Sequence, residues 1–133
     1  MLNAAARLTF RLRRYDHIND TLAILHWLRL PERVDFKLAV TAFKSLHDQS
    51  PSYLKVFQRV SDLPGRRSLR SSSTLRLVPA YCLSTIGLRS FPVAAAKIWN
   101  NLPDNVISAP SLPVFRSRLK TFLFRRSFPY ILL

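Results

Sequence analysis

Proline and glycine are used very unevenly in this sequence, and the imbalance limits the folds that the chain can adopt. Its 133 residues include 9 prolines and only 2 glycines. Tight β-turns rely on glycine because it adopts positive φ angles without a steric cost, whereas proline interrupts helices and marks the turns between them. The imbalance therefore favours helices joined by proline-marked turns over a tight-turned β-sandwich. A chain of this length allows one small domain with a core.

Residues 31–47 contain the clearest helical pattern. Pro31 suits a first helical position, and Glu32 and Asp35 follow it, where the helix dipole favours negative charge. At about 100° per residue, one stripe of apolar side chains recurs along this segment and should face the core. Its members are Phe36, Ala39, Val40, Phe43 and Leu46.

Weaker periodic patterns predict the remaining helices. We expect helices over residues 3–14 and 18–28, and a short helix within "SPSYLKVF". A further helix should open at Ser90 within "SFPVAAAKIWNNLP", and Ser111 should cap a last helix.

Apolar side chains at helical spacing mark the expected core faces of the first and last helices. In the first helix, Ala5, Leu8 and Leu12 fall on one side. The stripe of the last helix consists of Leu112, Phe115, Leu119 and Phe122.

Two short segments alternate in the manner of strands. "LRLVP" and "YCLSTI" are expected to form a β-hairpin with its turn near Pro79 and Ala80. The predicted fold is therefore mostly α: a small domain of five or six helices with one short β-hairpin.

We expect one domain over residues 1–133, without an internal repeat. It would comprise a helical half (1–60), a basic Arg/Ser loop (61–74), the hairpin with two helices (75–128) and a tail (129–133).

The positive charge of the chain is large and unevenly spread. The net charge is +14, with ten Lys/Arg against six acids up to residue 62 and eleven against Asp104 alone from there onward. Such an excess favours polyanionic partners, either nucleic acid or an anionic membrane surface. No apolar run is long enough to span a bilayer, so we expect no membrane span.

The candidate nucleic-acid contacts are basic residues in two regions. "SDLPGRRSLRSSST" has no helical period and reads as a loop, whose arginines suit phosphate contacts. A second group of basic residues lies beside the apolar stripe of helix 31–47. The candidate binding residues are Arg66, Arg67, Arg70, Arg76, Arg33, Lys37 and Lys44. The loop could equally be a solvated linker.

Three aromatic residues near the basic loop admit two interpretations. Tyr81, Phe91 and Trp99 could stack on bases. The favoured interpretation places them in the core.

The sequence offers few residues for catalysis or metal binding. Cys82 is the single cysteine, so no intrachain disulfide can form, and its apolar surroundings suit a buried, inert thiol. The three histidines form no close ligand pair of the kind zinc requires, and no serine lies in a GxSxG elbow. The acids are scattered, with no two adjacent. We therefore expect no enzyme, no cofactor, no metal and no small-molecule ligand.

The N-terminal stretch "MLNAAARLTFRLRRYDH" leaves an alternative open. It contains four arginines before Asp16, the first acid, as a mitochondrial presequence does. The other interpretation is an amphipathic first helix of the domain. We favour a nuclear or cytoplasmic location over a mitochondrial one and leave the compartment open.

Four stretches in order carry a resemblance to a known family. They are "NAAARL…RRYDHI", "LHWLRLPERVDFKLAVTAFKSLHDQSPSYL", "GRRSLRSSSTLRLVP" and "RSFPVAAAKIWNNLPDNVISAPSLPVFRSRLKTFLF". Together they cover roughly residues 3–128. The chain resembles the extreme C-terminal segment of reverse transcriptases encoded by animal non-LTR retrotransposons of the LINE type.

The resemblance implies a non-catalytic role. The polymerase of such elements needs an aspartate pair that this chain lacks, and the endonuclease is absent too. The matching region would lie beside the polymerase and help to hold template RNA or target DNA; the sequence does not distinguish RNA from DNA. The alternative is an orphan structural or protein-interaction fragment, a transposon relic whose apolar surface belongs against the absent polymerase region.

Overall fold

The computed structural model describes residues 2–65, 75–78, 87 and 90–131, and it is mostly helical, as predicted. Two single-turn 3-10 helices, η1 (Ser52–Leu54) and η2 (Val60–Asp62), follow the third α-helix. The six α-helices of this part of the chain are α1 (Leu2–Thr9), α2 (Asn19–Ile24), α3 (Leu30–Leu46), α4 (Phe91–Asn100), α5 (Asp104–Ile107) and α6 (Leu112–Ser127).

Prolines open the three longest helices. Pro31, Pro92 and Pro113 are each the second residue of their helix, in α3, α4 and α6. The first-turn N–H groups of a helix have no partner within it, so a residue without an N–H costs nothing there. Ser90 and Ser111 occupy the predicted cap positions, but neither side chain forms a capping hydrogen bond.

Three helices end at a residue with positive φ that is not glycine. Arg11, His26 and Asp48 have φ angles of 51°, 51° and 56° and follow α1, α2 and α3. In each case the next residue donates its N–H to the carbonyl five positions earlier, as Trp27 does to Leu22 at 2.8 Å. This geometry is the Schellman motif, which normally uses glycine.

These turns make the first two helices shorter than predicted. The segment predicted to be helical over 3–14 ends at Thr9, because the chain turns at Arg11. The predicted core face of this helix is also wrong: Leu8 is 82% exposed, whereas Ala6 is fully buried. With α1 only two turns long, Leu12 no longer belongs to its helical stripe, and Ala6 is the buried residue of the helix.

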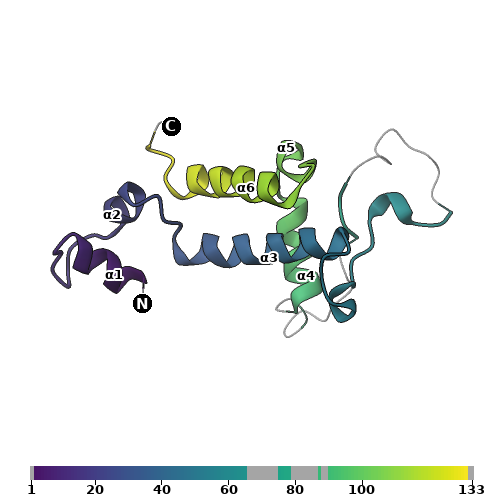
Figure 1. Cartoon of the computed structure of the whole chain (residues 1–133), viewed down its shortest axis with the longest axis horizontal. Coiled ribbons are helices and arrows are strands. Elements are labelled where there is room, and N and C mark those ends of the chain that lie inside the picture. The colour runs from purple at the N-terminus through teal and green to yellow at the C-terminus, as the bar shows by residue number, and fades with distance from the viewer. Residues whose placement is uncertain (1, 66–74, 79–86, 88–89, 132–133) are drawn as a thin grey trace.

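The core lies where α3, α4 and α6 meet. Figure 1 shows α3 and α6 side by side and running in opposite directions, with α4 crossing the C-terminal half of α3. Phe115 of α6 stacks on Phe43 of α3 at 4.4 Å between ring centroids and on Trp99 of α4 at 5.7 Å. All three side chains are at most 2% exposed. Aromatic packing therefore fixes the relative positions of the three longest helices.

The predicted core stripes of α3 and α6 are largely confirmed. Ala39, Val40 and Phe43 are buried in α3, and Phe36 and Leu46 pack against the core while remaining half-buried. In α6, Phe115 and Leu119 are fully buried, and Leu112 and Phe122 are half-buried.

The predicted β-hairpin is not seen in the described residues. Leu77 instead forms an isolated antiparallel bridge with Arg59. Hydrogen bonds donated by the N–H groups of Val60 and Val78, each 2.9 Å long, flank this bridge. The strand predicted within "LRLVP" therefore pairs with a segment that precedes it in the sequence. Its predicted partner, residues 81–86, lies outside the described residues.

Candidate nucleic-acid interface

The structure describes four of the seven predicted binding residues. Arg66, Arg67 and Arg70 lie outside the described residues, so their interpretation as phosphate contacts stays a prediction. The predicted residues of α3 follow one flank of that helix over about 17 Å. They are Arg33, Lys37 and Lys44.

Arg76 lies elsewhere and has a structural contact. Its guanidinium donates a hydrogen bond to the backbone carbonyl of Asn100, the last residue of α4. Carbonyls at a helix C-terminus lack intrahelical partners and carry partial negative charge, so an arginine stabilises them. Arg76 thus attaches the end of the Arg/Ser loop to α4. The structure does not bring it together with Arg33, which lies on the first turn of α3.

Helix α6 adds cations beside those of α3. Lys120 lines the same pocket as Arg33 and Lys37. Arg116 lies one helical turn before Lys120, on the same flank of α6. Because Phe43 stacks on Phe115, the residues that follow them, Lys44 and Arg116, lie at the same level of the antiparallel pair. We call these five residues (Arg33, Lys37, Lys44, Arg116 and Lys120) the basic strip.

No acid neutralises the basic strip within the described part of the chain. The ion pairs found there join Lys55 to Asp48 at 2.7 Å and Arg126 to Asp35, and none includes a residue of the strip. Asp35 lies on the opposite flank of α3, where it and Arg126 both line a second, smaller pocket. Helix α6 contains no acid at all. The strip therefore gathers positive charge on adjoining flanks of α3 and α6, which suits phosphates.

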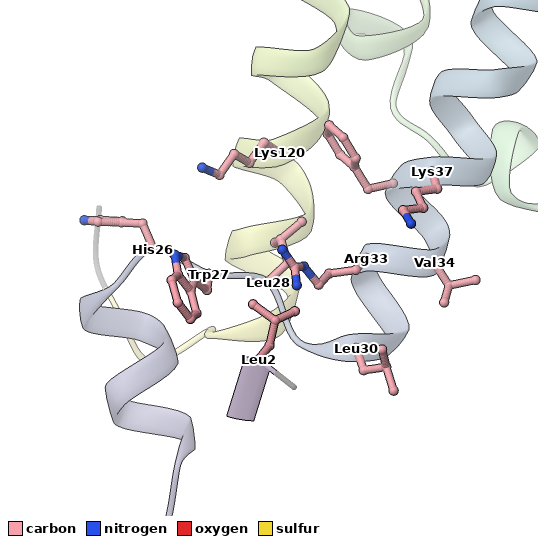
Figure 2. Close-up of a pocket in the computed structure, with 10 residues that line it drawn as sticks. Leu2, His26, Trp27, Leu28, Leu30, Arg33, Val34, Lys37 and Lys120 are labelled. Atoms are coloured by element: carbon pink, nitrogen blue, oxygen red, sulfur yellow. The ribbon is translucent and has the colours of Figure 1, made fainter. Parts of the chain in front are cut away.

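A pocket of about 640 Å³ lies at the end of the strip that is formed by the N-terminal half of α3. Figure 2 shows Arg33 reaching from α3 across this pocket towards Leu28, with Lys120 contributed by α6. Its wall is mostly apolar, and the aromatic residues Trp27 and Phe36 belong to it. A pocket of this size lies in the range typical of ligand sites.

The aromatic residues proposed for base stacking behave as core residues where they are described. Trp99 is 2% exposed, and its indole N–H donates to the carbonyl of Leu75 at 2.8 Å. Phe91 is half-buried and meets the ring of Phe57 edge-on, with 5.5 Å between centroids. Tyr81 lies outside the described residues.

The end of α3 carries two groups with shifted pKa values. Partial desolvation of His47, whose ring lies 4.1 Å from that of Phe43, and the positive charge of Arg59 lower its pKa despite the opposing effect of Asp48. A hydrogen bond from Lys55 and the charge of that ammonium group lower the pKa of Asp48. At neutral pH His47 is therefore uncharged and does not extend the basic strip.

The chain has no match among protein-family models, curated proteins or solved structures. None of the helices described by the structure is both long and apolar enough to cross a membrane. Likewise, no cluster of three or more His, Cys, Asp or Glu side chains that could hold a metal occurs among the described residues.

The sequence contains only a weak signal for the two cations that α6 adds to the basic strip. Arg116 and Lys120 fall on one flank of the apolar stripe of α6, and Arg118 and Arg125 on the other. Basic residues on both flanks are usual beside any buried helical stripe, because their aliphatic stems cover apolar surface. Only the antiparallel packing on α3 shows that the first flank joins Arg33 and Lys37.

Proposed function

We propose that this chain is a non-catalytic nucleic-acid-binding domain, and that it derives from the C-terminal segment of a LINE-type retrotransposon reverse transcriptase. The observation that carries the proposal is the basic strip, which joins cations of α3 and α6 without an acid between them. One strand of B-form DNA places about five phosphates along the length of the strip. The resemblance of residues 3–128 to the retrotransposon segment supports the origin.

The proposed role is accessory. The strip would hold the sugar-phosphate backbone of RNA or DNA and leave chemistry to a polymerase domain. Phosphate contacts position a nucleic acid without reading its sequence, so we expect binding with little sequence preference. The absence of an adjacent acid pair from the sequence supports a non-catalytic role.

Salt-dependent binding tests the proposal. We would measure the affinity of the whole chain for single-stranded RNA, single-stranded DNA and duplex DNA over a salt series. Neutralising five phosphates of a single strand through the basic strip should contribute about −3.5 to the slope of log K against log[salt]. Replacing Lys37 and Lys120 by Gln should reduce the magnitude of that slope by about 1.4.

A matched control distinguishes the effect of losing cations from the strip from the effect of lowering the net charge. Lys97 of α4 and Arg125 on the opposite flank of α6 are also exposed, so replacing both by Gln removes the same charge elsewhere. We expect the Lys97, Arg125 variant to change the salt slope by less than half as much as the Lys37, Lys120 variant does. Equal losses in the two double variants would contradict a specific role for the strip.

A second candidate function rests on exposed apolar side chains. Leu8, Ile24 and Leu30 are 82%, 65% and 74% exposed. A small domain that exposes such residues is typical of a fragment that packs against a partner. In this alternative the chain is an orphan interaction or structural fragment. Aggregation of the isolated chain, cured by adding the parent polymerase region, would favour it.

A further inference from the structure

The pocket at the end of the basic strip has an apolar entrance on α3. Leu30 and Val34 both line it, and they are 74% and 50% exposed. They lie one helical turn apart, so they form a continuous apolar ridge. Exposed aliphatic residues that adjoin an apolar pocket enlarge the apolar surface that a partner could cover.

Cations surround this apolar surface. Arg33 and Lys37 of α3 and Lys120 of α6 line the pocket, and no acid does. None of the three takes part in an ion pair between described residues. The pocket therefore suits an occupant that is apolar where it enters and negatively charged around the point of entry.

The chemistry of the wall distinguishes between anionic occupants. A nucleobase carries donors and acceptors on its edges, and a pocket that encloses those edges must pair them. Apart from the three cations, His26 and the indole of Trp27 are the polar side chains here, and the remainder of the wall is leucine, valine and phenylalanine. A volume of about 640 Å³ also holds several aliphatic side chains.

We propose that this pocket binds an acidic amphipathic helix of a partner protein. Two or three apolar side chains of that helix, spaced i, i+3 or i+4, enter the pocket and cover Leu30 and Val34. Aspartate or glutamate residues on its flanks face Arg33, Lys37 and Lys120. Helix-in-groove recognition uses this spacing of anchors, and opposite charges at the rim set its orientation and specificity. This activity is separate from nucleic-acid binding, although the two share the three cations.

The test uses the whole chain and fluorescently labelled probes. The first is a synthetic helix of about 20 residues with leucines at i, i+4, i+7 and i+11 and glutamates on both flanks. The second replaces its glutamates by lysines, and the third is a single-stranded DNA oligonucleotide. We expect the acidic helix to bind, and the basic helix to bind at least about tenfold more weakly.

Two double variants of matched composition locate the site. Leu30→Gln with Val34→Gln removes the apolar entrance, and we expect a loss of at least about tenfold in affinity for the acidic helix. Leu8→Gln with Val56→Gln replaces one exposed leucine and one exposed valine outside the pocket. Its affinity should stay within about twofold of the unmodified chain. Both doubles should bind the oligonucleotide with unchanged affinity, because phosphate contacts do not use these side chains.

Three outcomes would overturn the proposal. The first is an unchanged affinity of the Leu30, Val34 double variant for the acidic helix. The second is equal binding of the acidic and basic helices. The third is a tenfold loss of oligonucleotide binding in that double variant, which would assign the pocket to nucleic acid. All the substituted side chains are exposed, and circular dichroism verifies that each variant remains folded.

Discussion

The side-chain amide of Asn100 forms two hydrogen bonds with the backbone of Leu77, each 2.9 Å long: the Leu77 N–H donates to Oδ1, and Nδ2 donates to the Leu77 carbonyl. Leu77 uses neither of these groups in its bridge with Arg59, so Asn100 replaces a second neighbouring strand. Trp99, one residue earlier in α4, donates its indole N–H to the carbonyl of Leu75. The last turn of α4 therefore holds the segment at which the Arg/Ser loop ends.

Removing the amide of Asn100 should destabilise the domain. Asn100→Ala leaves the N–H and carbonyl of Leu77 without partners beside a side chain that is 1% exposed. We expect the free energy of unfolding to fall by about 2 kcal/mol, measured by urea denaturation. Asn101→Ala is the control, because Asn101 is exposed and its side chain makes no such contact. Equal effects of the two substitutions would contradict the assigned role.

Glycine at the end of α1 should stabilise the domain. Arg11 has a φ of 51°, in the left-handed region that costs a residue with a β-carbon about 1 kcal/mol. Arg11→Gly removes this strain, and we expect a gain of about 0.5–1 kcal/mol in the free energy of unfolding. Arg14→Gly removes the same charge at an exposed position with ordinary φ, and it should give no gain. A gain in both variants would attribute the effect to charge instead of backbone strain.

His47 should make the stability of the domain depend on pH. Its pKa in the folded chain lies below the ordinary value of 6.5, so the unfolded chain binds the proton more readily. The free energy of unfolding should therefore be unaffected by His47 above about pH 6.5 and should fall as the pH drops below that value. Urea denaturation at pH 7.5 and pH 5 measures this fall. The free energy of unfolding of His47→Gln should decrease less than that of the unmodified chain over the same pH interval. An identical decrease would contradict the lowered pKa of His47.

The Arg/Ser loop should add to the nucleic-acid affinity independently of the basic strip. Replacing the adjacent pair Arg66 and Arg67 by Ala should reduce the magnitude of the salt slope by about 1.4 for single strands. This reduction should add to that of the Lys37, Lys120 variant, because each cation neutralises a phosphate of its own. Replacing Arg13 and Arg14, an adjacent pair of exposed arginines near the N-terminus, is the control. An unchanged salt slope in the Arg66, Arg67 variant would show that these two arginines do not contact phosphates.

Helix starts and core stripes could be predicted because their causes are local. Pro31 opens its helix for a reason that involves only the first helical turn, and the helix predicted from Ser90 begins at the next residue. The stripe that contains Ala39 and Phe43 follows from the helical period alone. The short helix α5, a single turn after Pro103, was not predicted because four residues do not establish a period.

Helix ends were less predictable because their causes are partly non-local. Arginine does not favour a positive φ, histidine favours it far less than glycine does, and neither position carries a glycine. The turn after His26 places Trp27 beside the pocket, and the His26 ring lies 5.4 Å from that of Phe124 in α6. Packing of this kind offsets the cost of a left-handed residue, and it cannot be read from neighbouring residues.

The sequence by itself determined the helical class, the faces of α3 and α6 that enter the core, and the excess of positive charge. Periodicity, proline placement and composition carry that information, and each acts within a few residues or over the whole chain. Only the tertiary structure decided that Lys120 joins Arg33 and Lys37, that Asn100 pairs with Leu77, and that Leu77 forms a bridge with Arg59. Each of these joins residues that are far apart in the sequence, and their meeting depends on how the aromatic side chains of the core orient α3, α4 and α6.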